Sequence, residues 1–367
     1  MVEWKKIEEF AKCQAGATPS TKVRSYWDGG SIPWMNSGDV HQGVVTYTSG
    51  YITQLGYENS STKMLPKDTV VIALAGQGKT RGTVAITDIE LCTNQSICGI
   101  IIDNPSIRNK YIYYYLKTRY SDLRRVSSGD GTRGGLNLKM IGAYHIPIPS
   151  LSEQNRIVGI LDTFTASIEN LKEQITQRRK QFEHYRDQLL DLKGEEGVRM
   201  KIEDFCFLKA GKSIKSEEIA DLPADDYYPC YGGNGIRGFV PFFSHEGEYP
   251  IIGRQGALCG CVNWADGKFY ATEHAVVATG NDNVTQRFLM HLFQHADLNQ
   301  YKTQGAQPGL SVAKLNEVSF VIPSLSEQSR IVSILDTFEA SIQNLEAQLS
   351  QREKQYEYYR NKLLTFE

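Results

Sequence analysis

The chain has 367 residues, of which 41% are hydrophobic and 22% are charged, and its formal net charge is −2. This length suits two separate cores with connectors, and the composition is that of an ordinary globular protein. A net charge so close to zero does not by itself indicate a nucleic-acid-binding protein.

The sequence gives no sign of a membrane span or of a secreted, disulfide-linked fold. The apolar runs fall short of the ~18 residues that a membrane helix needs, and residues 1–10 do not resemble a signal peptide. Seven cysteines, an odd number, favour reduced thiols in a cytoplasm. Cys259 and Cys261 lack zinc-knuckle spacing, so we expect no structural metal.

Residues 1–147 form the first predicted domain. Short apolar runs at 69–74 and 84–86, bounded by glycine or proline, predict strands, and the tyrosine-rich stretch 108–123 predicts a helix. The segment has 17 Lys+Arg against 12 Asp+Glu, a net charge of about +5. We expect an α+β domain with basic loops.

Two glycine-rich stretches of this segment superficially match nucleotide-binding motifs. Residues 73–80 resemble the end of a P-loop, but the first glycine is missing and a strand, not a helix, is expected to follow. Residues 129–134 match G-x-G-x-x-G without a buried strand before them. Flexible basic loops are the favoured interpretation, and an NTPase is the enzymatic alternative.

Residues 148–197 contain a long predicted helix and a linker. Ser150 and Glu153 have the spacing of a capping box, and the apolar residues that follow alternate steps of four and three, a heptad pattern. About 40 residues at 1.5 Å each make a helix of ~60 Å. The predicted seam consists of Ile157, Leu161, Phe164, Ile168, Leu171, Ile175, Arg178, Phe182 and Tyr185.

Residues 198–321 form the second predicted domain, also α+β. Residues 201–205 repeat the pattern of 6–10, Gly309-Leu310 repeats Gly135-Leu136, and the interiors differ. The segment is acidic, with 11 Lys+Arg against 14 Asp+Glu. We expect one domain type that carries two different specificities. His291 and His295 are one helical turn apart without a third ligand in sequence, so a packed or solvent-facing pair is favoured over a metal site.

Residues 322–367 repeat the first helix. Between 148–190 and 322–364, 30 of 43 positions are identical at an offset of 174. The intervening domain lets the chain turn back, which predicts an antiparallel coiled coil within one chain and pseudo-two-fold symmetry. The second predicted seam consists of Ile331, Leu335, Phe338, Ile342, Leu345, Leu349, Arg352, Tyr356 and Tyr359.

Arg178 and Arg352 occupy seam positions where an apolar residue is expected. Either their stems cover apolar surface while the guanidinium groups stay in water, or the arginines fix the helix register or contact a partner. Both interpretations remain open on sequence alone.

The loops of both domains combine glutamine and arginine, which recognise base edges, with lysine and hydroxyl groups, which bind phosphates. Solvated loops also contain such residues, so residue types alone do not decide the matter. We find no methyltransferase, nuclease or helicase motif, and we expect a non-catalytic chain. The candidate DNA contacts are Gln77, Lys79, Thr80, Arg81, Arg124, Arg125, Arg133, Arg237, Arg254, Gln255, Lys302, Gln304 and Gln307.

The repeated stretch that begins Ile-Pro-Ser-Leu-Ser-Glu-Gln at 148 and 322 resembles the conserved helices of the specificity subunit of type I restriction-modification systems. The resemblance covers the whole chain. Segments 32–39, 229–236 and 253–256 resemble features of its target-recognition domains, and the first adds Asn36 and Ser37 to the candidate DNA contacts.

The resemblance implies that each recognition domain binds one half of a bipartite, gapped DNA site and that the helices set the spacer. It also implies that the helices dock two methyltransferase subunits, which bring S-adenosylmethionine, and that two restriction subunits bring ATP and Mg²⁺. We expect no cofactor on this chain. The alternatives are a specificity subunit of a type II methylase-nuclease system and a coiled-coil scaffold that does not bind DNA. Because the net charge is low, we expect the isolated subunit to bind DNA weakly.

Overall fold

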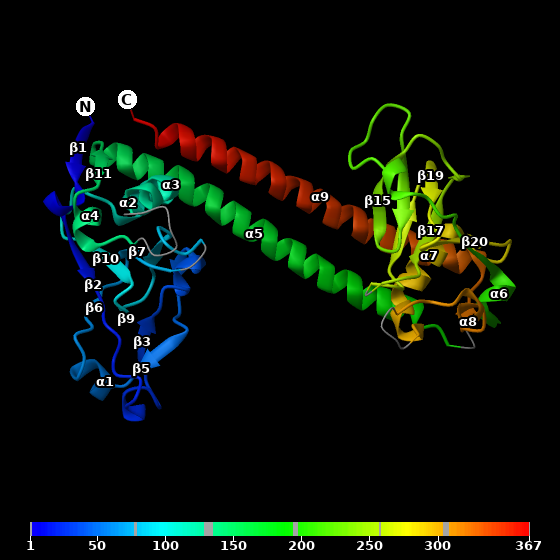
Figure 1. Cartoon of the computed structure of the whole chain (residues 1–367), viewed down its shortest axis with the longest axis horizontal. Helices are drawn as coiled ribbons and strands as arrows, with labels where there is room; N and C mark the ends of the chain where they lie inside the picture. Colours follow the sequence, from blue (N-terminus) through cyan, green and yellow to red (C-terminus); the bar gives the residue numbers. More distant parts are fainter. Residues whose placement is uncertain are drawn as a thin grey trace. The chain divides into compact units, whose positions relative to one another are not determined.

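The chain folds into two compact units, seen in the computed structural model in Figure 1. One unit comprises Met1–Asn170 with Ser350–Glu367, and the other comprises Leu171–Leu349. Each combines a globular domain with part of each of two long helices. The described residues are 2–76, 79–127, 135–193, 197–256, 258–303 and 308–366.

The globular domain of the first unit contains two sheets, with strand orders β2-β10-β7-β8-β4 and β5-β3-β9-β6. A separate antiparallel pair joins β1 (Glu3–Lys6) to β11 (His145–Ile148), directly before the first long helix. The sheet strands are β2 Ala11–Ala15, β3 Ile32–Met35, β4 Val44–Val45, β5 Gly50–Ile52, β6 Met64–Leu65, β7 Val70–Ala73, β8 Val84–Thr87, β9 Leu91–Thr93 and β10 Ile97–Ile102.

The helices of this domain are α1 Gln54–Glu58, α2 Asn109–Thr118, α3 Tyr120–Val126 and α4 Leu138–Gly142. The prediction of one helix over 108–123 was wrong, because Arg119 separates α2 from α3 with φ −99° and ψ 19°. One tertiary contact lies at this break, since the guanidinium of Arg119 donates to the carbonyl oxygen of Leu364 at 3.3 Å.

The globular domain of the second unit also contains two sheets, with strand orders β13-β20-β17-β18 and β15-β14-β19-β16. The pair formed by β12 (Val198–Lys201) and β21 (Ser319–Ile322) again precedes a long helix. The sheet strands are β13 Cys206–Ala210, β14 Tyr228–Gly232, β15 Gly235–Val240, β16 His245–Glu246, β17 Tyr249–Gly253, β18 Val262–Ala265, β19 Lys268–Ala271 and β20 Ala275–Gly280. The helices are α6 Ile202–Phe205, α7 Gln286–His295 and α8 Val312–Asn316.

The two globular domains share one topology. In the first, β3 pairs antiparallel with β5 and parallel with β9, and in the second β14 pairs antiparallel with β15 and parallel with β19. The strand order β2-β10-β7-β8 of the first domain also corresponds to β13-β20-β17-β18 of the second, and β4 is an additional strand in the first domain. The α+β class predicted for each domain is confirmed.

The repeated Gly-Leu pairs have the same backbone role in each domain. The amide of Leu136 donates to the carbonyl of Leu74 at 2.9 Å, directly after β7. The amide of Leu310 donates to the carbonyl of Arg254 at 2.8 Å, directly after β17. This bond ties the segment before each long helix to the candidate loop that follows the corresponding strand.

The two long helices are α5 (Leu151–Leu190) and α9 (Leu325–Leu363). At their starts, the hydroxyl oxygens of Ser150 and Ser324 each accept the backbone amide three residues later at 3.3 Å, as expected for a cap. Each glutamate of the expected capping box, Glu153 or Glu327, forms a bidentate pair with the arginine three residues later.

The first apolar residues of each long helix belong to the core of the adjoining domain. Ile157 and Leu161 are fully buried in the hydrophobic cluster that contains Tyr111, and Ile331 and Leu335 are fully buried in the cluster of the second domain. Full burial of such a side chain stabilises the fold by about 1.5–3 kcal/mol. Each helix is therefore anchored in a domain through the first two residues of its predicted seam.

Candidate nucleic-acid interface and paired helices

Three candidate DNA-contacting segments of the first domain lie next to one another. Tyr120 donates from its hydroxyl to the backbone carbonyl of Lys79 at 2.9 Å, and Arg124 donates to the same hydroxyl at 3.0 Å. Thr80 hydrogen-bonds to the ring of His41 at 3.1 Å, in the turn that follows Asn36. These contacts join segments that are 39 or more residues apart in sequence.

The predicted contacts on this surface differ in exposure. Arg125 has 81% of its side chain exposed and pairs with Asp122 at 2.7 Å, whereas Arg81 is buried. Lys79 is exposed, and Ser37 and Thr80 are partly exposed. A buried guanidinium is poorly placed to meet a phosphate, so Lys79 and Arg125 are the stronger candidates on this surface.

The turn that resembles a P-loop has no helix after it. It continues into β8 (Val84–Thr87), as predicted from the sequence. A helix N-terminus would be needed to present several amides to a phosphate.

The side-chain amide group of Asn36 already has partners within its own loop. Its nitrogen donates to the Ser49 hydroxyl at 2.6 Å, and its oxygen accepts the backbone amide of Gly38 at 2.6 Å.

The candidate segments of the second domain also converge. Gln255 forms a β-bridge with Gly309, and the amide of Thr303 donates to the carbonyl of Gly309 at 2.9 Å, which brings Lys302 alongside. A side chain at Gly233 would collide with the carbonyl of Gln255 at 2.8 Å, so this glycine permits the close approach.

Gln255 and Lys302 are exposed and Arg254 is half-buried. Arg237 is exposed on β15 and donates to the Ser216 hydroxyl at 2.7 Å. Four further candidates lie outside the described residues: Gln77, Arg133, Gln304 and Gln307.

Inside each unit, α5 and α9 run side by side and antiparallel (Figure 1). In the first unit the Phe164 ring packs against Tyr356 and Tyr359, at centroid distances of 6.4 and 5.5 Å. In the second, the equivalent Phe338 packs against Phe182 and Tyr185 at 6.5 and 5.3 Å. The predicted antiparallel coiled coil is confirmed.

The two arginines of the seam have equivalent surroundings. Arg352 lies over the ring of Phe164 at 5.6 Å in the first unit, and Arg178 lies over the ring of Phe338 at 5.7 Å in the second. Because a cation is attracted to the negative face of an aromatic ring, these contacts favour the register interpretation over a purely solvated head group.

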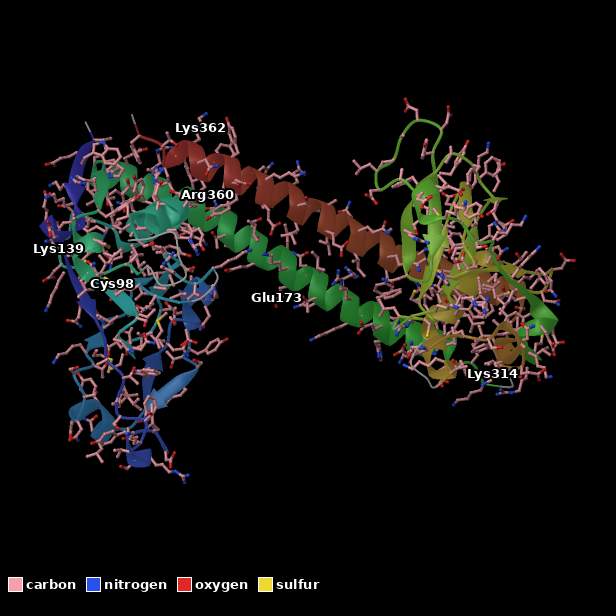
Figure 2. All side chains as sticks on the ribbon, in the orientation of Figure 1. Cys98, Lys139, Glu173, Lys314, Arg360 and Lys362 are labelled. Atoms are coloured by element: carbon pink, nitrogen blue, oxygen red, sulfur yellow. The ribbon has the colours of Figure 1, made fainter. Side chains whose placement is uncertain are left out.

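The exposed ends of the helices carry further cations. Arg360 lies over the ring of Tyr356 at 5.7 Å, and Lys362 follows it near the end of α9 (Figure 2). Lys362 of α9 also lines a groove of 560 Å³ in the first unit, together with Ile160 and Phe164 of α5. The first half of α5 and the end of α9 therefore form a groove with both apolar and charged lining residues.

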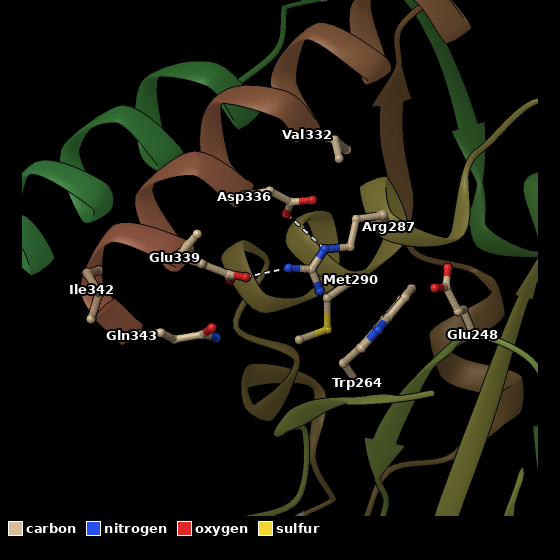
Figure 3. Close-up of a pocket in the computed structure, with 10 residues that line it drawn as sticks. Glu248, Trp264, Arg287, Met290, Val332, Asp336, Glu339, Ile342 and Gln343 are labelled. Atoms are coloured by element: carbon tan, nitrogen blue, oxygen red, sulfur yellow. Dashed lines mark hydrogen bonds and ion pairs between the residues drawn. The ribbon is translucent and has the colours of Figure 1, made fainter. Parts of the chain in front are cut away.

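A polar network that sequence reasoning missed joins α7 to α9 (Figure 3). Arg287 donates to Asp336 at 2.8 Å and to Glu339, and the fully buried ring of His291 hydrogen-bonds to Asp336 at 2.8 Å. Burial lowers the pKa of His291, although Asp336 opposes this effect. The network borders an 860 Å³ groove lined also by Trp264 and Met290.

The first unit contains a counterpart of this network. Lys110 of α2 pairs with Asp162 of α5 at 2.8 Å, and the hydroxyl of Tyr114 donates to Asp162 at 2.7 Å. Burial raises the pKa of Tyr114 above its ordinary value. Asp162 and Asp336 are equivalent in the repeat, and this identity was the sequence signal that could have indicated the contact.

His291, Asp336 and Glu339 are also a possible ligand set for a metal ion, since their ligand atoms lie within 4.8 Å of one another. However, Arg287 already pairs with both carboxylates and supplies the positive charge that a cation would bring. The arrangement fits an ion-pair contact between domain and helix better than a metal centre. In the described part of the chain, no helix is long and apolar enough to cross a membrane.

Comparison with known proteins gives a consistent result over the whole chain. The family model described as type I restriction modification DNA specificity domain matches residues 1–178 and 195–353. The type I restriction enzyme EcoprrI specificity subunit of Escherichia coli is 33% identical over 355 residues, which cover 92% of this chain and 88% of the relative.

Solved structures share the fold. The type I restriction-modification S subunit from M. genitalium has a TM-score of 0.68 at 18% identity, over 100% of this chain and 97% of that one. A chain from a study of complex assembly and conformational transition of the type I restriction-modification system has a TM-score of 0.60 at 15% identity, over 99% and 96%. Two family-model matches and a relative that spans nearly the whole chain place this protein in the type I restriction-modification DNA specificity family.

Proposed function

We propose that this chain is the sequence-recognition subunit of a type I restriction-modification complex and that each globular domain binds one half of a bipartite, gapped DNA site. The observation that carries the proposal is that the two domains share a fold and similar helices but have different loop sequences. Apart from the additional β4, both domains have the same strand order, and they adjoin helices that are identical at 30 of 43 positions, whereas their convergent polar loops differ in sequence. A shared frame with different loops suits two different half-sites.

The paired helices would set the spacer and dock two methyltransferase subunits. Their near-identity supports this role, because two identical partners require two equivalent surfaces. S-adenosylmethionine would be bound by the methyltransferase subunits, and ATP and Mg²⁺ by two restriction subunits. The chain itself would be non-catalytic and would supply only recognition and geometry.

A domain exchange tests this proposal. Residues 1–147 would be replaced by the corresponding segment of a relative with a known methylation site, and the methylated motif would be determined in cells that also express the methyltransferase subunit. We expect one half of the motif to change and the other half to stay the same. A chimera that changes both halves, or methylates an unbroken motif, would contradict the assignment of one half-site to each domain.

A further inference from the structure

Two fully buried glutamines occupy equivalent positions at the starts of the long helices. Gln154 lies in the first turn of α5 and Gln328 in the first turn of α9, and neither side chain has exposed surface. Both belong to the repeated stretch, 174 residues apart. A buried primary amide is costly unless its donors and acceptor are all paired, so its partners show what it does.

In the first unit the Gln154 side chain makes three hydrogen bonds to two segments of backbone. Its oxygen accepts the backbone amide of Arg108 at 2.9 Å, immediately before α2. Its nitrogen donates to the carbonyl of Ser106 at 3.1 Å and to the carbonyl of Pro149, before α5, at 2.9 Å. The glutamine thus joins the domain's main helix to the start of the long helix.

In the second unit Gln328 makes the same three bonds. Its oxygen accepts the amide of Thr285 at 2.9 Å, immediately before α7. Its nitrogen donates to the carbonyls of Asn283 at 2.8 Å and Pro323 at 3.0 Å. The domains differ in most loop residues, yet this connection is preserved bond for bond.

The glutamines add directional bonds at the base of each long helix, where the neighbouring core contacts are apolar. Asp162 and Asp336 make polar contacts with the same domains about two helical turns further along. Ile157 and Leu161, like Ile331 and Leu335, bury the base of each helix in its domain, and such contacts are not directional. A completely paired buried network, in contrast, admits one arrangement. The backbone atoms bound here belong to the segments that determine how the domain is rotated on its helix.

Recognition of two half-sites at a fixed spacing requires a precise orientation of each domain on its helix. One base pair of spacer moves a half-site by about 3.4 Å along the duplex and rotates it by about 35°. A domain that could tilt on its helix by a comparable amount would accept neighbouring spacers. Discrimination between spacers therefore needs a rigid junction between each domain and its helix.

We propose that Gln154 and Gln328 are positioning residues that fix the orientation of each recognition domain on its long helix and thereby restrict the spacer length that the complex accepts. The inference rests on the proposed DNA-recognition function. It assigns spacer selectivity to the domain–helix junctions, in addition to the length of the helices.

The test uses the complete chain assembled with its methyltransferase subunits. Methylation rates would be measured on duplexes with the natural spacer and with spacers one base pair longer or shorter. In Gln328→Met, which keeps the side-chain length and removes all three bonds, we expect the preference for the natural spacer to fall about five- to tenfold, with both half-site sequences unchanged. Gln154→Met is the matched variant and should behave alike.

Ser150→Ala and Ser324→Ala are the controls, because they remove the adjacent helix caps and leave the glutamine bonds in place. They should lower stability without changing the spacer preference. If Gln328→Met does not assemble, Gln328→Asn, which retains the amide but shortens its reach, replaces it.

A spacer preference that is unchanged in assembled glutamine variants would overturn the positioning role, even if overall activity fell. Failure of the proposed function looks different, because the wild-type complex would then methylate no gapped site at all.

Discussion

The guanidinium of Arg178 lies 5.7 Å from the centroid of the Phe338 ring, and the equivalent arginine and phenylalanine of the repeat form the same contact in the other unit. Heptad seams usually exclude charge, because a charged group loses hydration there. The aromatic face offsets this loss. Each phenylalanine lies about four helical turns before the arginine of its own helix, so the two contacts can form together only when the helices are antiparallel.

We predict that Arg178→Met, which keeps an apolar stem of similar length, destabilises the second unit by about 0.5–1 kcal/mol through loss of the cation–π contact. Arg178→Ala should cost more, because the stem packing is lost as well. Urea denaturation of both variants provides the measurement. Arg352→Met is the matched control and should have an effect of similar size, whereas a Met variant as stable as wild type would show that the contact contributes nothing.

The His291 network predicts a pH dependence in one unit only. Burial lowers the pKa of His291 in the folded protein, so below its unfolded pKa of about 6.5 the unfolded chain binds more protons. The stability of the second domain should therefore be complete above about pH 6.5 and decrease as the pH falls below it, by at most about 1.4 kcal/mol per pH unit. The groups that face the ring are Asp336, Glu339 and Arg287.

Hydrogen exchange of the α7 amides, corrected for intrinsic rates, measures this dependence. The measurements would be made at about pH 7.5 and about pH 5, on either side of the unfolded pKa of about 6.5. His291→Tyr places the residue type of the equivalent Tyr114 in the network and should abolish the decrease. An equal decrease in wild type and variant would assign the titration to another group.

The exposed position of Lys79 predicts a phosphate contact. In the assembled complex, Lys79→Ala should weaken binding of all DNA sequences about equally and reduce the slope of log K against log salt by about 1. Binding measured at several salt concentrations would test this. The same variant also tests the NTPase alternative for the glycine-rich turn. Unchanged ATP hydrolysis by the assembled complex would rule that alternative out.

The spacer role of the helices predicts an effect of matched insertions. Seven residues inserted after both Asn170 and Leu349 add about 10 Å to each helix, an axial length of at most about three base pairs. The preferred spacer should lengthen, by the whole number of base pairs that best satisfies both length and rotation. Insertion in one helix only should disturb the pairing, and methylation assays on a series of spacers would distinguish the two cases. A preferred spacer that stays the same after matched insertions would contradict the spacer role.

Much of the architecture could be predicted because its signals are local or repeated. The seam of α5 and α9 was predicted from the heptad pattern and its duplication, and β7 and β8 were predicted from short apolar runs bounded by turn residues. The common topology of the two domains was only weakly indicated, because strand pairing depends on contacts between distant residues. The break at Arg119 was missed for the same reason.

The polar junctions could not be predicted from residue types. Gln154 and Asp162 look like ordinary polar residues of a helix surface, and their role appears only when α2 is placed against α5. The buried state of Arg81 likewise depends on tertiary packing, although its neighbours Lys79 and Thr80 have exposed surface. For Gln154 and Asp162, identity between the two repeats was the sequence signal that pointed to their roles.

The most direct test of the central claim is to sequence adenine methylation across the genome of a host that expresses this chain with its methyltransferase subunit. We predict a single motif of two specific parts separated by a spacer of fixed length, with one methylated adenine in each part. An unbroken motif, or no methylation that depends on this chain, would contradict it.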